Sequence, residues 1–126
     1  MSSAKKYLVI LLSSVVIPNY LMDFSYQKRN NFKIQAKVWL YQGMAGWHFI
    51  TVPKKQSNKI KKIFGEMKKG WGSLPVMVTI GKTSWKTSIF PDKKAGAYLL
   101  PLKAEVRKKE GIVSGNTINF LLEIRV

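Results

Sequence analysis

Apolar and polar residues alternate along several short segments of the chain, with the period of two that is typical of half-buried β-strands. The alternations and shorter apolar runs cover residues 32–41, 47–52, 74–80, 83–90, 97–100 and 118–124. Gly81-Lys82 separates two of these segments and is a two-residue turn of the kind that needs positive φ, so the flanking strands should pair antiparallel. The pattern therefore predicts six strands.

Two other segments, residues 54–64 and 103–110, have the period of a short amphipathic helix, with apolar residues on one face and lysines on the others. Each follows a proline that we expect at the helix start, and each ends at a glycine: Pro53 and Gly65 for the first, Pro101 and Gly111 for the second. The order strand, proline, basic helix, glycine, loop, strand thus occurs twice.

This repetition predicts the fold class. Residues 50–80 and 99–124 are the two copies, and two such units in one chain favour a mainly β fold: a β-barrel with two short helices and an internal pseudo-twofold, of the double-split type. Because strand–helix–strand units are common, chance similarity between the two copies is the alternative.

Residues 1–31 differ from the rest, so we predict an N-terminal apolar and basic extension at 1–31 and a single small barrel domain at 32–126. Lysines precede the apolar run 7–17, as in a secretory signal, but no small-residue cleavage site follows and the run is short for a membrane span. Residues 1–21 are then a signal or anchor, a docked helix, or an extension upstream of a true start at Met22. We expect a cytoplasmic protein, with export or membrane anchoring as the alternative if residues 1–21 act as a signal.

The charge balance is strongly basic. The 126 residues include 22 Lys and Arg against 6 Asp and Glu, a formal net charge of +16. Residues 32–126 carry 18 of the basic and five of the acidic residues, or +13, so the charge belongs to the domain. Such a field favours polyanionic partners, nucleic acid above all, although solubility alone also explains a lysine-rich surface. Contact with a membrane surface is a further expectation only if residues 7–17 are retained.

Catalytic chemistry has little support in the sequence. There is no cysteine, His48 is the single histidine, and no cluster has metal-ligand spacing. His48 lies between Trp47 and Phe49 in a predicted strand, where a structural hydrogen bond explains it better than a catalytic role. We therefore expect no enzymatic activity, no catalytic residue, no metal and no cofactor.

Two kinds of binding site are candidates. Basic residues on the two predicted helices would form a phosphate footprint for nucleic acid: Lys55, Lys59, Lys62, Arg107, Lys108 and Lys109. Aromatic and polar residues would alternatively surround a pocket for a small ligand or a protein partner: Trp47, His48, Trp71, Trp85, Lys86 and Tyr98.

Large aromatic rings commonly pack in the core, and that alternative stays open for the tryptophans and tyrosines among these residues. Trp39 and Tyr41, interleaved with Lys33 and Lys37, could instead form an exposed stripe on which nucleic-acid bases stack.

Specific motifs also resemble known families. The second strand–helix–strand unit, with its Leu100-Pro101, Val106-Arg107 and Gly115-Asn116-Thr117-Ile118, resembles the AbrB-type DNA-binding unit, which works as a homodimer. Because this chain would carry both halves, a monomer is plausible.

Residues 32–126 resemble the bacterial domain-of-unknown-function family nineteen-oh-five (DUF1905). The matching motifs are Gly46-Trp47-His48-Phe49, Gly70-Trp71-Gly72-Ser73, the segment 85–91, Tyr98-Leu99-Leu100-Pro101 and Val106-Arg107-Lys108. The resemblance implies a double-split β-barrel with no established activity.

Overall fold

A computed structural model describes residues 30–43, 46–68 and 72–126 of the chain. The chain divides into two units, Met1–Asn30 and Asn31–Val126, and the second is the subject here. The alternatives proposed for residues 1–21, and the pocket residue Trp71, lie outside the described residues.

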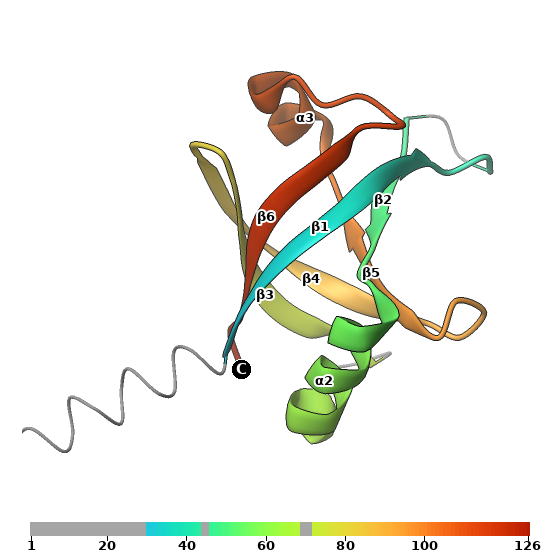
Figure 1. Cartoon of the computed structure of the whole chain (residues 1–126), viewed down its shortest axis with the longest axis vertical. Coiled ribbons are helices and arrows are strands. Elements are labelled where there is room, and N and C mark those ends of the chain that lie inside the picture. The colour runs from blue at the N-terminus through green and yellow to red at the C-terminus, as the bar shows by residue number, and fades with distance from the viewer. Residues whose placement is uncertain (1–29, 44–45, 69–71) are drawn as a thin grey trace, which may run out of the picture. The chain divides into compact units, whose positions relative to one another are not determined.

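Six strands, two α-helices and one short 3-10 helix make up the described part of the second unit (Figure 1). In chain order they are β1 (Asn31–Leu40), β2 (His48–Thr51), α2 (Lys54–Phe64), η1 (Gly65–Met67), β3 (Leu74–Ile80), β4 (Thr83–Asp92), β5 (Ala97–Pro101), α3 (Ala104–Glu110) and β6 (Thr117–Ile124).

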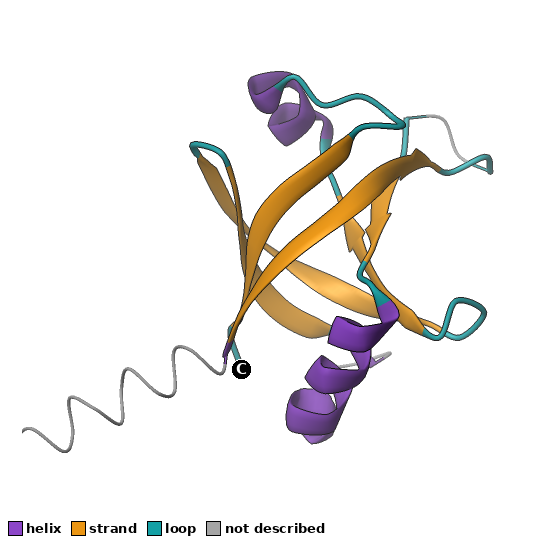
Figure 2. Cartoon of the chain, in the orientation of Figure 1, coloured by secondary structure: helices purple, strands orange, loops and turns teal. Residues whose placement is uncertain are grey.

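The strands form a closed antiparallel barrel in the order β1-β2-β5-β4-β3-β6 (Figure 2). Strand β1 closes it, because its first part pairs with β6, at Phe32 with Leu122, and its last part pairs with β2, at Val38 with Ile50. The predicted mainly β fold, a barrel with two short helices, is confirmed.

The chain passes through this barrel twice in the same order: β1-β2-α2-β3 and then β4-β5-α3-β6. The equivalent strands β2 and β5 are antiparallel neighbours, as are β3 and β6, which is the pairing that a pseudo-twofold axis requires. The repeated unit therefore has one more strand at its start than the sequence pattern indicated. The relation of the second half to AbrB-type units stays a prediction.

The core lies inside the barrel, where alternate residues of each strand meet. Val76, Val78 and Leu122 are among the side chains with at most 1% exposure, and their neighbours along the strands face outward. Leu40 continues the alternation of the inward-facing residues of β1 but is 40% exposed. It is the last residue of β1, where the strand reaches the rim of the barrel and no further layer covers it.

The two helices begin and end differently. Pro53, expected as the first helical residue, is the N-cap residue of α2, one position before the helix begins at Lys54. Pro101 does not begin α3: it is the last residue of β5 and pairs with Phe49, so that expectation was wrong. A proline is tolerated at a strand end, and the chain stays extended until Lys103, the N-cap residue of α3.

Candidate binding sites

Helices α2 and α3 lie at opposite ends of the barrel (Figure 1). The reason is topological: each helix follows one strand of the antiparallel pair β2 and β5, so the chain leaves these two strands in opposite directions. The six predicted phosphate-binding residues consequently fall into two groups, Lys55, Lys59 and Lys62 on α2 and Arg107, Lys108 and Lys109 on α3. The structure does not bring them together in one footprint.

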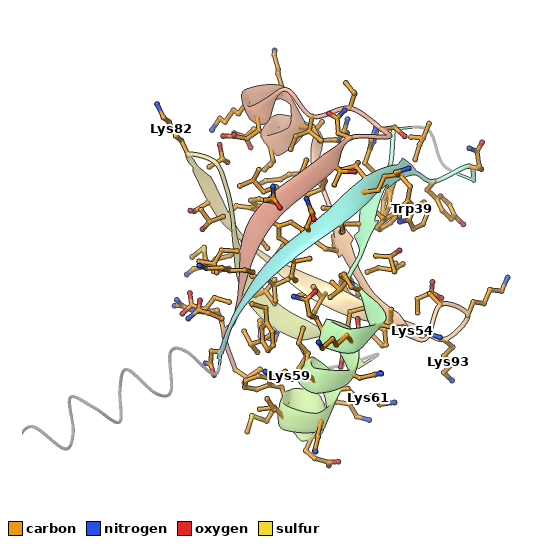
Figure 3. The ribbon with its side chains drawn as sticks, viewed as in Figure 1. Trp39, Lys54, Lys59, Lys61, Lys82 and Lys93 are labelled. Atoms are coloured by element: carbon orange, nitrogen blue, oxygen red, sulfur yellow. The ribbon has the colours of Figure 1, made fainter. Side chains whose placement is uncertain are left out.

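Helix α2 presents five lysines to solvent and contains no acidic residue. We name these residues the lysine surface: Lys54, Lys55, Lys59, Lys61 and Lys62. Figure 3 shows Lys54, Lys59 and Lys61 projecting from the helix, with Lys93 of the β4–β5 turn beside it. None of the five forms an ion pair with a residue that the structure describes.

A pocket of about 510 Å³, the α2 pocket, lies between this helix and the β4–β5 turn. Lys61, Lys68 and Lys93 line it together with Asp92 and Tyr98. Burial raises the pKa of the Tyr98 hydroxyl above its ordinary value, so the hydroxyl stays protonated near neutral pH. The predicted ligand pocket included Tyr98 beside Trp47 and Trp85. That grouping was wrong, because β5 carries Tyr98 to the α2 end of the barrel.

Two of the three cations of α3, Arg107 and Lys109, have local partners. The Arg107 guanidinium donates from Nε to the Leu102 carbonyl oxygen and from Nη2 to the Gly46 carbonyl oxygen, both at 3.1 Å. Lys109 Nζ lies 3.6 Å from a Glu105 carboxylate oxygen. Arg107 therefore ties α3 to the loop before β2, and part of the charge of α3 is compensated locally.

A second pocket, the α3 pocket, has a volume of about 540 Å³ and lies between α3, the start of β2 and the middle of β4. It brings together four of the six predicted pocket residues and two further cations: Trp47, His48, Trp85, Lys86, Lys103 and Arg107. These residues come from positions far apart in the sequence, which closure of the barrel makes neighbours. No aspartate or glutamate is among the described residues that line this pocket.

His48 and Arg107 share one anchor in this pocket. His48 Nδ1 lies 2.9 Å from the Gly46 carbonyl oxygen, the same atom that accepts from Arg107. Because a carbonyl oxygen can only accept, Nδ1 carries the proton and donates. The His48 backbone carbonyl in turn accepts from the Leu102 N–H at 2.9 Å, so this wall of the pocket is cross-linked.

Aromatic residues of β1 and β2 form a cluster on the outer surface of the barrel. Trp39, Tyr41 and Trp47 all pack on the Phe49 ring, with centroid distances of 5.3, 6.1 and 5.8 Å. Trp39 Nε1 also donates to Thr51 Oγ1 at 3.0 Å. The proposed aromatic stripe is thus a packed cluster, in which Tyr41 and Trp47 stay exposed.

The match to known families decides what the chain is related to. The family model described as "Domain of unknown function (DUF1905)" matches residues 35–122, more than two thirds of the 126-residue chain. The chain belongs to the DUF1905 family. This confirms the family resemblance seen in the aromatic and proline motifs, and the match spans both candidate pockets. A search of curated proteins found no match.

Neither a metal site nor a membrane-spanning helix is found in this DUF1905 domain as far as the structure describes it. Among residues 30–43, 46–68 and 72–126, no three His, Asp or Glu side chains lie close enough to hold a metal ion. In the same ranges, every helix is too short or too polar to cross a bilayer.

Sequence reasoning missed several lysines of both sites. Lys54 and Lys61 are seven positions apart, so they share one stripe of α2, and this spacing could have placed them together. Lys103 is four positions before Arg107 in the predicted helix 103–110, so spacing could have linked these two as well. Lys93 had no such signal, because it joins the α2 pocket through the path of the barrel strands.

Proposed function

We propose that this DUF1905 domain is a non-enzymatic binding module that engages a polyanion, nucleic acid in the first place, through the lysine surface of α2. Lys93 and Lys94 of the neighbouring β4–β5 turn extend that surface. The proposal narrows the footprint expected from the sequence, since it leaves out the α3 residues.

One observation carries the proposal: a helix with five exposed lysines and no acid, in which only Lys61 and Lys62 of the last turn are placed where the helix dipole favours cations. Lys54 and Lys55 lie in the first turn of α2, where the helix dipole disfavours positive charge. Lys55 and Lys59 are four positions apart, and like charges at this spacing destabilise a helix. Local rules are commonly broken at functional positions, and a row of unpaired ammonium groups is suited to phosphate contacts.

The contrast with α3 supports this choice of surface. Arg107 is engaged with two backbone carbonyls, and Glu105 lies within 4 Å of Lys103 and Lys109. Those cations have local partners, whereas no α2 lysine forms an ion pair with a described residue.

The test measures binding of labelled single-stranded and duplex oligonucleotides by fluorescence polarisation, with salt varied from about 50 to about 500 mM. The triple variant Lys55→Gln, Lys59→Gln, Lys62→Gln should weaken binding by about a hundredfold at 150 mM salt, because each lost phosphate contact removes about 0.9 from the slope of log K against log salt. A slope lower by about 2.7 is therefore expected.

A matched variant removes the same charge from the other end of the barrel: Lys103→Gln, Lys108→Gln, Lys109→Gln. It should leave the slope nearly unchanged. Equal losses for the two triple variants would mean that only net charge matters, and absence of binding by the unmodified chain at about 50 mM salt would refute the proposal. Heparin as competitor separates general polyanion binding from a preference for nucleic acid.

A second candidate role is a ligand-binding accessory barrel. The observation that favours it is the α3 pocket, where Trp47, His48, Trp85 and Lys86 converge.

A further inference from the structure

The α3 pocket has the composition of a small-molecule site, and we infer that it binds a planar aromatic oxyanion, a flat ring that carries a carboxylate or a phosphate. This inference rests on the second candidate role above, and it specifies the chemical class of the ligand. Its binding does not depend on polyanion binding at α2, which lies at the other end of the barrel.

The first supporting feature is an open aromatic wall. Trp47 is 48% exposed, and its indole packs on one side against Phe49. Trp85 is 9% exposed and is anchored in the core by β4, so it provides a fixed surface on the other part of the pocket. A flat ring placed here would cover exposed indole surface, and stacking of this kind contributes beyond the buried area alone.

The second feature is a set of cations without acidic partners in the pocket. Lys86, Lys103 and Arg107 line it, and the lining that the structure describes contains no carboxylate. Lys86 forms no ion pair with a described residue, and Lys103 lies 3.8 Å from Glu105, which is outside the pocket lining. An oxyanion in the pocket would therefore meet the charges of Lys86 and Arg107, neither of which is paired with a described carboxylate.

Arg107 is the best positioned of these cations. Its hydrogen bonds to the Leu102 and Gly46 carbonyls use two of its five N–H groups and hold the guanidinium plane in place. The other three N–H groups have no acceptor among the described residues. A guanidinium that is fixed by carbonyls rather than by a carboxylate keeps its full charge for a ligand, and a carboxylate or phosphate fits its geometry.

His48 adds a polar position beside Arg107. With Nδ1 donating to Gly46, the Nε2 atom of the neutral ring is an acceptor, so it can serve a hydroxyl or amino group of the ligand and not the oxyanion itself. The volume of about 540 Å³ is within the range of pockets that bind molecules of one or two rings. An anion without a ring would leave the indoles uncovered, and a neutral ring would leave the cations without a partner.

The experiment uses the full chain and isothermal titration calorimetry with two aromatic oxyanions, salicylate for a carboxylate and adenosine monophosphate for a phosphate. Each has matched controls: salicylamide and adenosine lack the charge, while acetate and inorganic phosphate lack the ring. Binding of either oxyanion at least tenfold tighter than its two controls supports the inference, and the arm that binds identifies the anionic group.

Two variants locate the site. Trp47→Ala and Lys86→Gln should each weaken the binding by about tenfold, since both side chains are at the surface and their loss should not unfold the barrel. Trp47→Phe retains a ring and should recover most of the affinity. Lys59→Gln, at the α2 end, should leave the affinity unchanged while it weakens oligonucleotide binding.

Three results would overturn the inference: no binding of either oxyanion at millimolar concentration, equal binding of the neutral or ringless controls, or unchanged affinity in both Trp47→Ala and Lys86→Gln. If instead these two variants weaken oligonucleotide binding as much as the α2 variants do, the pocket is part of the polyanion surface and the inference also fails. Failure of polyanion binding at α2 alone leaves it intact.

Discussion

The helices α2 and α3 occupy equivalent positions in the two halves of the barrel, and they differ in how their charges are arranged and in how they end. Helix α3 has Glu105 in its first turn and Arg107, Lys108 and Lys109 in its last, which is the order that the helix dipole favours. It ends at Gly111 in the left-handed conformation, with φ of 64°. Its charges are therefore explained by its own stability.

Helix α2 shares only the basic last turn, which contains Lys61 and Lys62. Its first turn has no acidic residue, and Gly65 stays right-handed and continues into η1, while neither helix has a side-chain cap at its start. What holds α2 in place is burial: Ile60 and Phe64 face the core, and the buried Ser57 bonds to the barrel. The comparison teaches that the positive charges of a basic helix can add to its stability, as in α3, or reduce it, as in the first turn of α2. Charges that reduce stability indicate a binding partner.

The largest expected effect tests whether α2 depends on its buried face. Phe64→Ala should lower the free energy of unfolding by about 3–5 kcal/mol, because it leaves a cavity where a 2% exposed ring had packed. Val106→Ala on α3 removes two methyl groups and should cost roughly 2 kcal/mol. Urea denaturation of both variants measures this. Equal losses would mean that the two helices depend on burial to the same degree.

The next prediction concerns the polar tether of α2. Ser57 Oγ donates to the Val52 carbonyl at 2.9 Å and accepts from the Tyr98 N–H at 3.1 Å, so it extends the pairing of β2 and β5. Ser57→Ala leaves the Tyr98 N–H buried without its acceptor and should cost about 1–3 kcal/mol. Hydrogen exchange at the Tyr98 amide should also accelerate. An unchanged exchange rate would contradict a stabilising hydrogen bond between the Tyr98 N–H and Ser57 Oγ.

The glycines that follow the two helices should respond with opposite signs. Gly111→Ala places a Cβ in open space but forces a left-handed conformation, which should cost about 1–2 kcal/mol. Gly65→Ala has right-handed backbone angles and meets only the Lys61 side chain at 3.5 Å, so it should stabilise the domain by about 0.4–1 kcal/mol. Thermal unfolding of the pair checks the signs, and destabilisation by both would refute the assigned helix ends.

The smallest effect separates stability from binding. Lys55→Glu places an acid in the first turn of α2, four positions before Lys59, and should raise stability by about 0.3–1 kcal/mol. The same change should weaken oligonucleotide binding. Glu105→Lys, the reverse change on α3, should lower stability by a similar amount and leave binding nearly unaffected. If Lys55→Glu destabilises the domain, the α2 lysines serve the fold after all.

Much of the fold followed from local pattern. The alternation around Val76 and Val78, ending at Gly81, predicted β3 with the observed bounds, and the apolar positions Ile60 and Phe64 did the same for α2. These segments are determined by near neighbours in the sequence. The start of α3 was misplaced because Pro101 is compatible with both a helix start and a strand end, and pairing with Phe49 on another strand decides between them.

The sites were less predictable, since they depend on where the barrel carries each strand. Trp47 and Trp85 line the same pocket, whereas Tyr98 lines the pocket at the opposite end of the barrel. The separation of α2 from α3 follows from the antiparallel pairing of β2 with β5, which the sequence pattern does not specify. The role of Arg107 as a donor to two carbonyls was equally absent from the sequence pattern.

The pairing of β1 with β6 also governs how the domain reaches its folded state. The β3–β4 hairpin has a two-residue turn and can form within microseconds, whereas Phe32 must meet Leu122 across nearly the whole domain. Folding should therefore take milliseconds to seconds. During synthesis, β1 is made first and waits for β6, the last strand, before its backbone is fully paired. In that interval its edge is open to other chains, so aggregation during folding should depend on β1 more than on any later strand.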